Sequence, residues 1–182
     1  MLTESTTILC PVINNDTPLE IDLKAILVAE IRQDEVAIVT PGKAPELLSE
    51  FNRSWRELHG LYTQLTVEKN KADKVVEQRR AVLILEEVPK VLKEKGLQSN
   101  ETNREAVISL DEAYQKAQDV SDQIEAIIEY IKGKMKSFDN AFTSVKKILG
   151  GSDYNRYRNE HLSGTTENTS APQVKGFGKA KY

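Results

Sequence analysis

The chain has 182 residues, of which 29% are charged and 6% are aromatic. This length suffices for one domain with a modest core, and the composition favours an elongated helical protein over a β-sandwich or barrel. The formal net charge of -3 argues against a simple polycationic nucleic-acid binder, so any such activity must come from local basic patches.

Residues 1–44 are the least regular part of the sequence, and we expect a small appendage there, either a small α/β unit or a short helix with extended segments. The segment "TTILCPV" has β character, and "VAIVT" is β-like again. Between them, Asp16 or Thr17 followed by Pro18 predicts the start of a helix. The N-terminal residues carry no basic region ahead of their apolar run, and the longest apolar stretch, "AILVA", is too short to span a bilayer. We therefore expect a cytoplasmic protein without secretory signal or membrane segment.

A 3.5-residue period begins after Pro45 and predicts the first of two long helices. The positions that follow its steps of three and four are Leu48, Phe51, Trp55, Leu58, Tyr62, Leu65, Lys69, Ala72, Val76, Arg79 and Leu83. Because Phe51, Trp55 and Tyr62 lie on this seam, we predict that they belong to the core and not to a stacking platform. The helix is expected to end near Pro89, and "QSNETN" marks a turn.

A second helix of similar length is predicted to open at Thr102, which has capping-box spacing to Glu105. Its periodic positions are Val107, Leu110, Tyr114, Ala117, Val120, Ile124, Ile127, Ile131, Met135, Phe138, Phe142, Val145 and Leu149. Gly150 and Gly151 are expected to end it. Two matched helices joined by a short turn should fold back as an antiparallel hairpin, and their partly apolar outer faces predict a homo-oligomer.

The predicted fold class is thus all-α: a long antiparallel helical hairpin (coiled coil) over residues 45–150, with the appendage before it. Residues 151–182 are expected to form a flexible, disordered basic-aromatic tail, since "LSGTTENTSAPQ" is polar and contains Ser, Thr, Asn and Pro. The tail ends in "VKGFGKAKY", which fits a nucleic-acid arm, a peptide that docks on a partner, or an inert end.

Five cations fall within twelve residues of the first helix, and one of them, Arg79, occupies a position where an apolar residue is expected. They are Lys69, Lys71, Lys74, Arg79 and Arg80. Such residues bind a nucleic-acid backbone by neutralising phosphates. A hairpin that places Val88 opposite Val107 would instead set them beside residues 114–126. The carboxylates of that stretch include Asp119, Asp122 and Glu125. Spacing alone leaves phosphate binding and internal ion pairing equally open.

A second basic block, residues 130–158, holds seven bases and two acids. The bases are Lys132, Lys134, Lys136, Lys146, Lys147, Arg156 and Arg158. Tyr154 and Tyr157 interleave aromatic rings with these cations, the mixture that binds single strands by stacking and by phosphate contact. The alternative is a surface of long basic side chains at a helix C-terminus. Because few acids compete locally, the sequence favours nucleic-acid binding here.

No catalytic or metal-binding constellation is recognisable. Cys10 is the single cysteine, and it is remote in sequence from His59 and His161, so no zinc-ligand spacing exists. The segments "PGKAPE" and "GFGKAKY" lack the phosphate-loop pattern. We therefore expect no enzyme activity, no metal and no cofactor.

The segment "VISLDEAYQKAQDVSDQIEAIIEYIKGKMKSFDNAFTSVKKIL" resembles the C-terminal half of the bacteriophage UvsY-type recombination mediators. The likeness lies in the heptad helix with its "IEAIIEYI" core, the following "KSF" and the aromatic residue before a "VKK" ending. Upstream, "IDLKAILVAEI", "PELLSEFNRSW" and a basic helix follow the family's order of elements, so the resemblance covers roughly residues 20–149. The chain departs from the family in a longer β-like N-terminal segment and an extended tail.

The resemblance implies a ring-like homo-oligomer that binds single-stranded DNA without sequence preference. Such mediators help to load a RecA-like recombinase onto strands covered by a single-strand-binding protein. The family's DNA-contacting cations correspond to Lys69, Lys71, Lys74, Arg79 and Arg80. We predict a non-enzymatic single-stranded DNA-binding accessory protein of phage recombination or replication, located in the host-cell cytoplasm. The alternative is a coiled-coil scaffold or adaptor that binds only protein partners.

Overall fold

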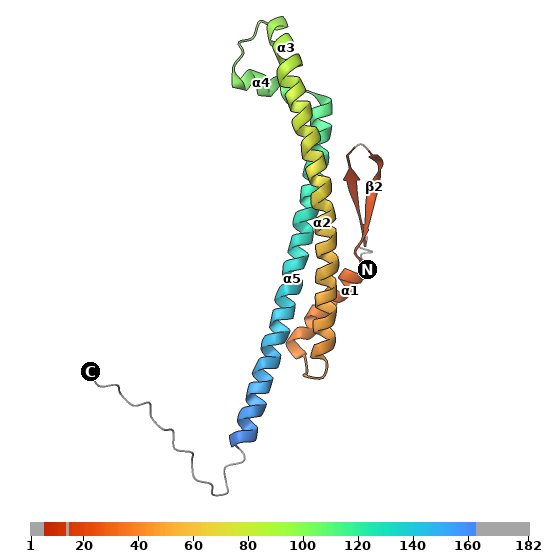
Figure 1. Ribbon diagram of the computed structural model, residues 1–182, viewed down its shortest axis with the longest axis vertical. Coiled ribbons are helices and arrows are strands. Elements are labelled where there is room, and N and C mark those ends of the chain that lie inside the picture. The colour runs from red at the N-terminus through yellow and green to blue at the C-terminus, as the bar shows by residue number, and fades with distance from the viewer. Residues whose placement is uncertain (1–5, 14, 163–182) are drawn as a thin grey trace, which may run out of the picture.

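The structure is a computed structural model that describes residues 6–13 and 15–162, with the backbone alone at residues 15–16 and 152–162. Two long antiparallel helices lie side by side, with a two-stranded sheet beside them and short helices near both ends (Figure 1). The predicted all-α helical hairpin with a small N-terminal appendage is confirmed. Among the described residues, no helix combines the length and the apolar character that a membrane span requires.

The appendage begins with a β-hairpin. Strand β1 (Thr7–Val12) pairs antiparallel with β2 (Asn15–Asp22), and the register shifts around Pro11, which has no backbone N–H to donate. Pro18 lies inside β2, so the helix start predicted from the Asp-Thr-Pro pattern is wrong. Both strands of a two-stranded sheet have an open edge, where a proline removes no ladder hydrogen bond.

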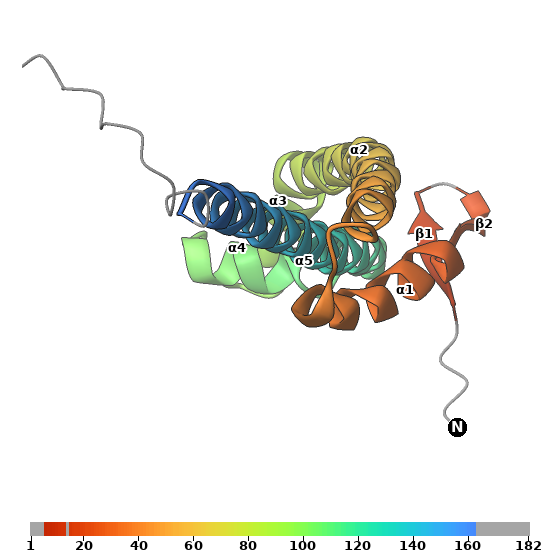
Figure 2. The ribbon, with the colours of Figure 1, turned by 90° about the horizontal axis from the view of Figure 1, so that it is seen from below.

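Two short helical elements connect the sheet to the hairpin: α1 (Lys24–Ile31) and the 3-10 helix η1 (Arg32–Ile38). The β-like segment "VAIVT" therefore lies partly in a helical turn, and the strand predicted there is wrong. Carboxylates in the first turn of η1, Asp34 and Glu35, favour a helical N-terminus. Seen from below, α1 lies against one side of the helix pair (Figure 2).

The long helices α2 (Ala44–Val82) and α5 (Glu112–Leu162) pack along the predicted heptad seam. The fully buried seam residues are Phe51, Leu58, Leu65, Ala72, Ile124, Ile131, Phe138 and Val145. The same core cluster includes Cys10, Ile26 and Ala29, so the appendage covers part of the seam. Burial raises the pKa of the Cys10 thiol.

The first long helix does not end at Pro89 as predicted. A π-helical turn, η2 (Leu83–Glu87), follows α2, and α3 (Val88–Glu94) then continues in the same direction (Figure 1). Pro89 lies directly after this π-helical turn, where the backbone hydrogen bonds already depart from the α-helical pattern. A turn at Gly96, with a φ of 62°, then reverses the chain.

The predicted second helix is interrupted near its start. Helix α4 (Glu101–Ile108) is capped by Asn100 and not by Thr102, because the Asn100 side chain accepts the backbone N–H three residues on, at 2.8 Å. A turn follows, in which Leu110 is 72% exposed although the heptad pattern placed it in the seam. Asp111 then caps α5 by accepting a backbone N–H at 2.7 Å.

Helix α5 passes through Gly150 and Gly151 and reaches Leu162, so its predicted end at Gly150 is wrong. Glycine weakens a helix interior by roughly 1 kcal/mol relative to alanine, but it does not forbid helical dihedral angles. In Figure 1 the last turns of α5 extend past the start of α2. The remainder of the predicted tail, residues 163–182, lies outside the described residues.

Candidate nucleic-acid interface

Arg79 is held by carboxylates of its own chain. Its Nε and Nη2 atoms donate to the two Asp111 carboxylate oxygens at 2.9 and 2.5 Å, and Nη1 donates to Glu87 at 3.0 Å. The hydrogen bonds to Asp111 raise the pKa of Arg79, and the same contact lowers the pKa of Asp111. The basic residue at this seam position therefore has a structural partner at the start of α5.

Lys69 takes part in a second polar cluster that crosses the hairpin. Its Nζ atom lies 2.6 Å from Asp73 and 3.4 Å from Glu125 of α5. The buried Ser121 hydroxyl donates to Asp73 at 2.5 Å. Partial burial alone would lower the pKa of Lys69, but hydrogen bonds and charges of Asp73 and Glu125 outweigh it and raise that pKa. The contact with Glu125 is an ion pair within the hairpin, the alternative to phosphate binding that the sequence pattern left open for this cation.

The other three cations of the first cluster lie nearer to solvent. Arg80 pairs with Glu105 of α4 at 2.5 Å, and Lys71 pairs with Glu68 at 2.8 Å. Lys74 is exposed and forms no ion pair with any residue that the structure describes. Four of the five cations thus have carboxylate partners within the hairpin.

Two lysines of the second basic block are also paired. Lys132 lies 2.6 Å from Glu129 on α5, and hydrogen bonding to Glu129 raises its pKa. Lys134 donates to both Glu30 oxygens, at 2.7 and 2.6 Å, and so ties α5 to α1. Burial alone would lower the pKa of Lys134, but Glu30 raises it.

Lys136, Lys146 and Lys147 are exposed, and none of them has a carboxylate partner among residues 6–13 and 17–151, whose side chains the structure describes. The Lys146 ammonium lies 4.5 Å from the centroid of the Phe142 ring. At about 100° per residue these three lysines fall on the same side of α5 as Lys132. We call these four lysines the basic face of α5.

The remaining predicted residues follow on the same helix. At the same angular spacing, positions Tyr154, Tyr157 and Arg158 continue the basic face, whereas position Arg156 falls on the other side of α5, as Lys134 does. Asp139 is the one carboxylate on this side of α5 between Lys132 and Lys147. The helix therefore brings most, but not all, of the second block together.

An aromatic ladder on α2 adjoins the basic face. The rings of Trp55 and His59 stack with centroids 5.1 Å apart and an interplanar angle of 21°, and Tyr62 lies 6.3 Å beyond His59. The Lys132 ammonium lies 5.8 Å from the Tyr62 ring centroid. Trp55 and Tyr62 are half-buried against the core and His59 is exposed, whereas Phe51 is fully buried as predicted. The sequence pattern did not predict this ladder, because it assigned Trp55 and Tyr62 to the seam. Their spacings of four and three residues from His59 would have been sufficient to predict that the three rings lie next to one another on the helix.

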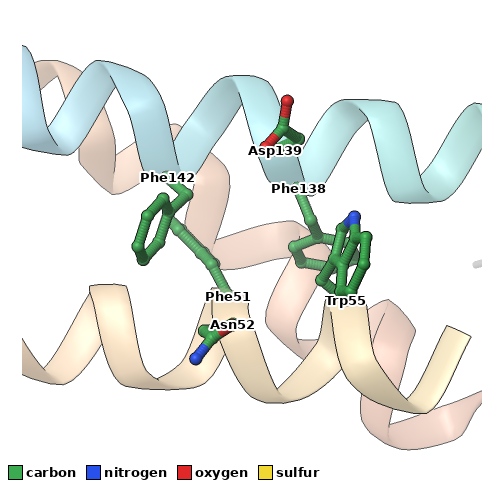
Figure 3. Close-up of a pocket in the computed structure, with 6 residues that line it drawn as sticks. All are labelled: Phe51, Asn52, Trp55, Phe138, Asp139 and Phe142. Atoms are coloured by element: carbon green, nitrogen blue, oxygen red, sulfur yellow. The ribbon is translucent and has the colours of Figure 1, made fainter. Parts of the chain in front are cut away.

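A pocket of about 230 Å³ opens at one end of the ladder (Figure 3). Trp55 rises toward it from α2 and Phe142 descends from α5, as Figure 3 shows. The buried rings of Phe51 and Phe138, 5.9 Å apart, lie between them. Asn52 and Asp139 complete the lining. The pocket is therefore aromatic inside, with one amide and one carboxyl group among its walls.

Across the described part of the chain, no group of three or more His, Cys, Asp or Glu side chains is placed to hold a metal ion. Comparisons with known proteins found no matching family model, no matching curated protein and no matching solved structure.

Proposed function

We propose that this protein binds single-stranded DNA as a non-enzymatic accessory factor of phage recombination or replication in the host-cell cytoplasm. The observation that carries the proposal is the basic face of α5, where three exposed lysines lack a carboxylate partner among the described residues. A strand laid along this face would neutralise phosphates and release counterions. The resemblance to UvsY-type mediators supports the same function. It also suggests a RecA-like recombinase and a single-strand-binding protein as partners.

The Lys69–Arg80 cluster has a smaller part in this proposal than its spacing in the sequence predicted. Arg79 and Lys69 would have to leave hydrogen-bonded carboxylates in order to reach a phosphate. The more exposed pairs of Lys71 and Arg80 are of a kind that contributes only about 0–1 kcal/mol, so a strand could displace them. We therefore assign the main contact to α5 and a secondary contact to Lys71, Lys74 and Arg80.

Self-association is the second component of the proposal. Several large apolar side chains are more than half exposed, and contact with a second copy of the chain would cover some of them. They are Leu9, Val28, Ile31, Ile38, Leu85 and Leu110. A homo-oligomer would also place several weak basic faces on one strand and raise the affinity through avidity.

Fluorescence anisotropy with a labelled single strand tests the proposal. We expect the full chain to bind at low salt and to lose most of its affinity as salt rises, because the contact is with phosphates. Binding that is insensitive to salt would contradict a phosphate contact. Absence of binding at low salt would overturn the proposed function.

A protein-only scaffold is the second candidate, and the hairpin tip favours it. Leu85 in η2 and Leu110 between α4 and α5 are 77% and 72% exposed. The elements that carry them, η2 and the turn between α4 and α5, lie toward the end of the molecule away from residues 136–147 (Figure 1). Exposed apolar side chains of this kind suit a protein partner better than a polyanion. The anisotropy measurement separates the two candidates, since a scaffold of this type predicts no response to oligonucleotide.

A further inference from the structure

We infer that the aromatic pocket and ladder between α2 and α5 form a stacking groove for unpaired nucleobases. The groove consists of Trp55, His59, Tyr62 and Phe142 with the pocket that Trp55 and Phe142 line. This inference rests on the proposed function and names the part of the molecule that would take the bases, as distinct from the phosphates. The sequence pattern alone had assigned Trp55 and Tyr62 to the core.

The rings are arranged as a base-binding surface requires. Trp55, His59 and Tyr62 succeed one another along α2 at centroid separations of 5.1 and 6.3 Å, so neighbouring bases of one strand could meet neighbouring rings. Every nucleobase has a π-face, and stacking on aromatic side chains therefore needs no particular sequence. His59 is exposed, which leaves the middle of the ladder open to solvent.

Cations accompany the rings on the opposite wall. Lys132 lies beside Tyr62, and Lys146 lies beside Phe142, so ammonium groups mark both ends of the groove. Lys136 lies between them on the basic face and has no carboxylate partner in the described ranges. A strand could thus keep its phosphates on α5 while its bases turn toward α2.

The pocket itself suits a base better than a phosphate. Its walls are mainly aromatic, and the Asp139 carboxyl group would repel a phosphate but accept a hydrogen bond from a base amino group. The Asn52 amide can both donate to and accept from a base edge. A volume of about 230 Å³ is small, which fits one flat ring system and excludes a folded element.

The chain supplies its own reporter of this groove, because Trp55 is its single tryptophan. The experiment titrates the full chain with an oligothymidylate and with an abasic strand of equal length, following anisotropy and tryptophan emission together. We expect the oligothymidylate to quench Trp55 and to bind more tightly than the abasic strand, which should leave the emission nearly unchanged.

His59→Ala provides the variant, because His59 is exposed and its loss should leave the core intact. We expect it to weaken oligothymidylate binding by about fivefold or more, the range for one lost stacking contact, without changing affinity for the abasic strand. Gln64→Ala is the matched control, since Gln64 is exposed and lies about half a turn around α2 from Trp55. Its affinities should equal those of the native chain.

The outcomes separate this inference from the proposed function. If anisotropy shows no binding of either strand, the proposed function fails and the inference with it. If both strands bind equally, Trp55 emission does not change, and His59→Ala behaves like Gln64→Ala, the stacking groove is overturned while phosphate binding by α5 stands.

Discussion

Arg79 and Asp111 are joined by two hydrogen bonds, of 2.9 and 2.5 Å, although they lie 32 residues apart in the chain. The same Asp111 carboxylate accepts the backbone N–H of Tyr114 and so caps α5. One guanidinium therefore fixes where the second long helix begins relative to the first. A charged contact at a seam position is a known means of setting register in paired helices.

A double-mutant cycle on this pair tests its structural role. We expect Arg79→Met and Asp111→Asn each to lower the urea midpoint of unfolding, because each leaves a polar partner without its hydrogen bonds. The double variant should lose less than the sum of the two single losses. Additive losses, measured by circular dichroism, would mean that the two side chains do not stabilise the fold together.

The pH dependence of stability follows from the lowered pKa of Asp111. A carboxyl group whose pKa is lower in the folded state stabilises the fold above its unfolded pKa, and that contribution disappears as pH falls through the folded pKa. The native chain should therefore exceed Asp111→Asn in stability by a constant amount above about pH 5 and lose this advantage below about pH 4. An advantage that stays constant down to about pH 2 would contradict the ion pair.

Ser121 is predicted to stabilise the crossing of the two long helices. Its hydroxyl is buried and donates to Asp73 at 2.5 Å. Replacing it with alanine should lower the free energy of unfolding by about 1 kcal/mol, a typical value for one lost hydrogen bond. Thr143→Ala, at an exposed position on the same helix, serves as the control and should change stability by less than about 0.5 kcal/mol. Equal changes in the free energy of unfolding for the two substitutions would show that the Ser121–Asp73 hydrogen bond does not stabilise the fold.

The heptad pattern was sufficient to predict the hairpin, because period and burial are local properties of a helix. The N-terminal region was harder to predict, because its secondary structure depends on strand pairing and not on a local period. A proline such as Pro18 is compatible with both the first turn of a helix and the open edge of a strand. Pairing with β1 decides between the two. Gly150 was similarly ambiguous, since a glycine can end a helix or lie within it.

The candidate site could be predicted only in part. Sequence placed the cations on two long helices, but their partners depend on contacts across the fold. Lys134 meets Glu30, 104 residues away, and Arg79 meets Asp111 in a turn that the heptad pattern did not contain. No local pattern encodes such pairs. The exposed lysines of α5 became distinguishable from the paired ones only once the helices were placed.

Self-association can be measured directly in solution. We expect sedimentation equilibrium to give a mass above the 20.5 kDa of one chain. Leu85→Ser combined with Leu110→Ser should shift the distribution toward the monomer, because it removes the exposed apolar side chains at the hairpin tip. Ile38→Ser, at an exposed site on η1, tests whether the shift toward the monomer is specific to substitutions at the hairpin tip. A native chain that sediments as a monomer would contradict the proposed homo-oligomer.

The most direct test of the account is the salt dependence of single-strand binding by a charge-reversed basic face. The variant is Lys136→Glu with Lys146→Glu and Lys147→Glu, and its control reverses the exposed lysines Lys90, Lys93 and Lys95 at the hairpin tip, which gives the same change in net charge. We expect the α5 variant to lose most of its affinity and to reduce the slope of log K against log salt by about 2, at roughly 0.7 per lost phosphate contact. The tip control should retain a slope close to the native one. Equal affinities and slopes for the two variants would show that α5 is not the DNA-binding surface.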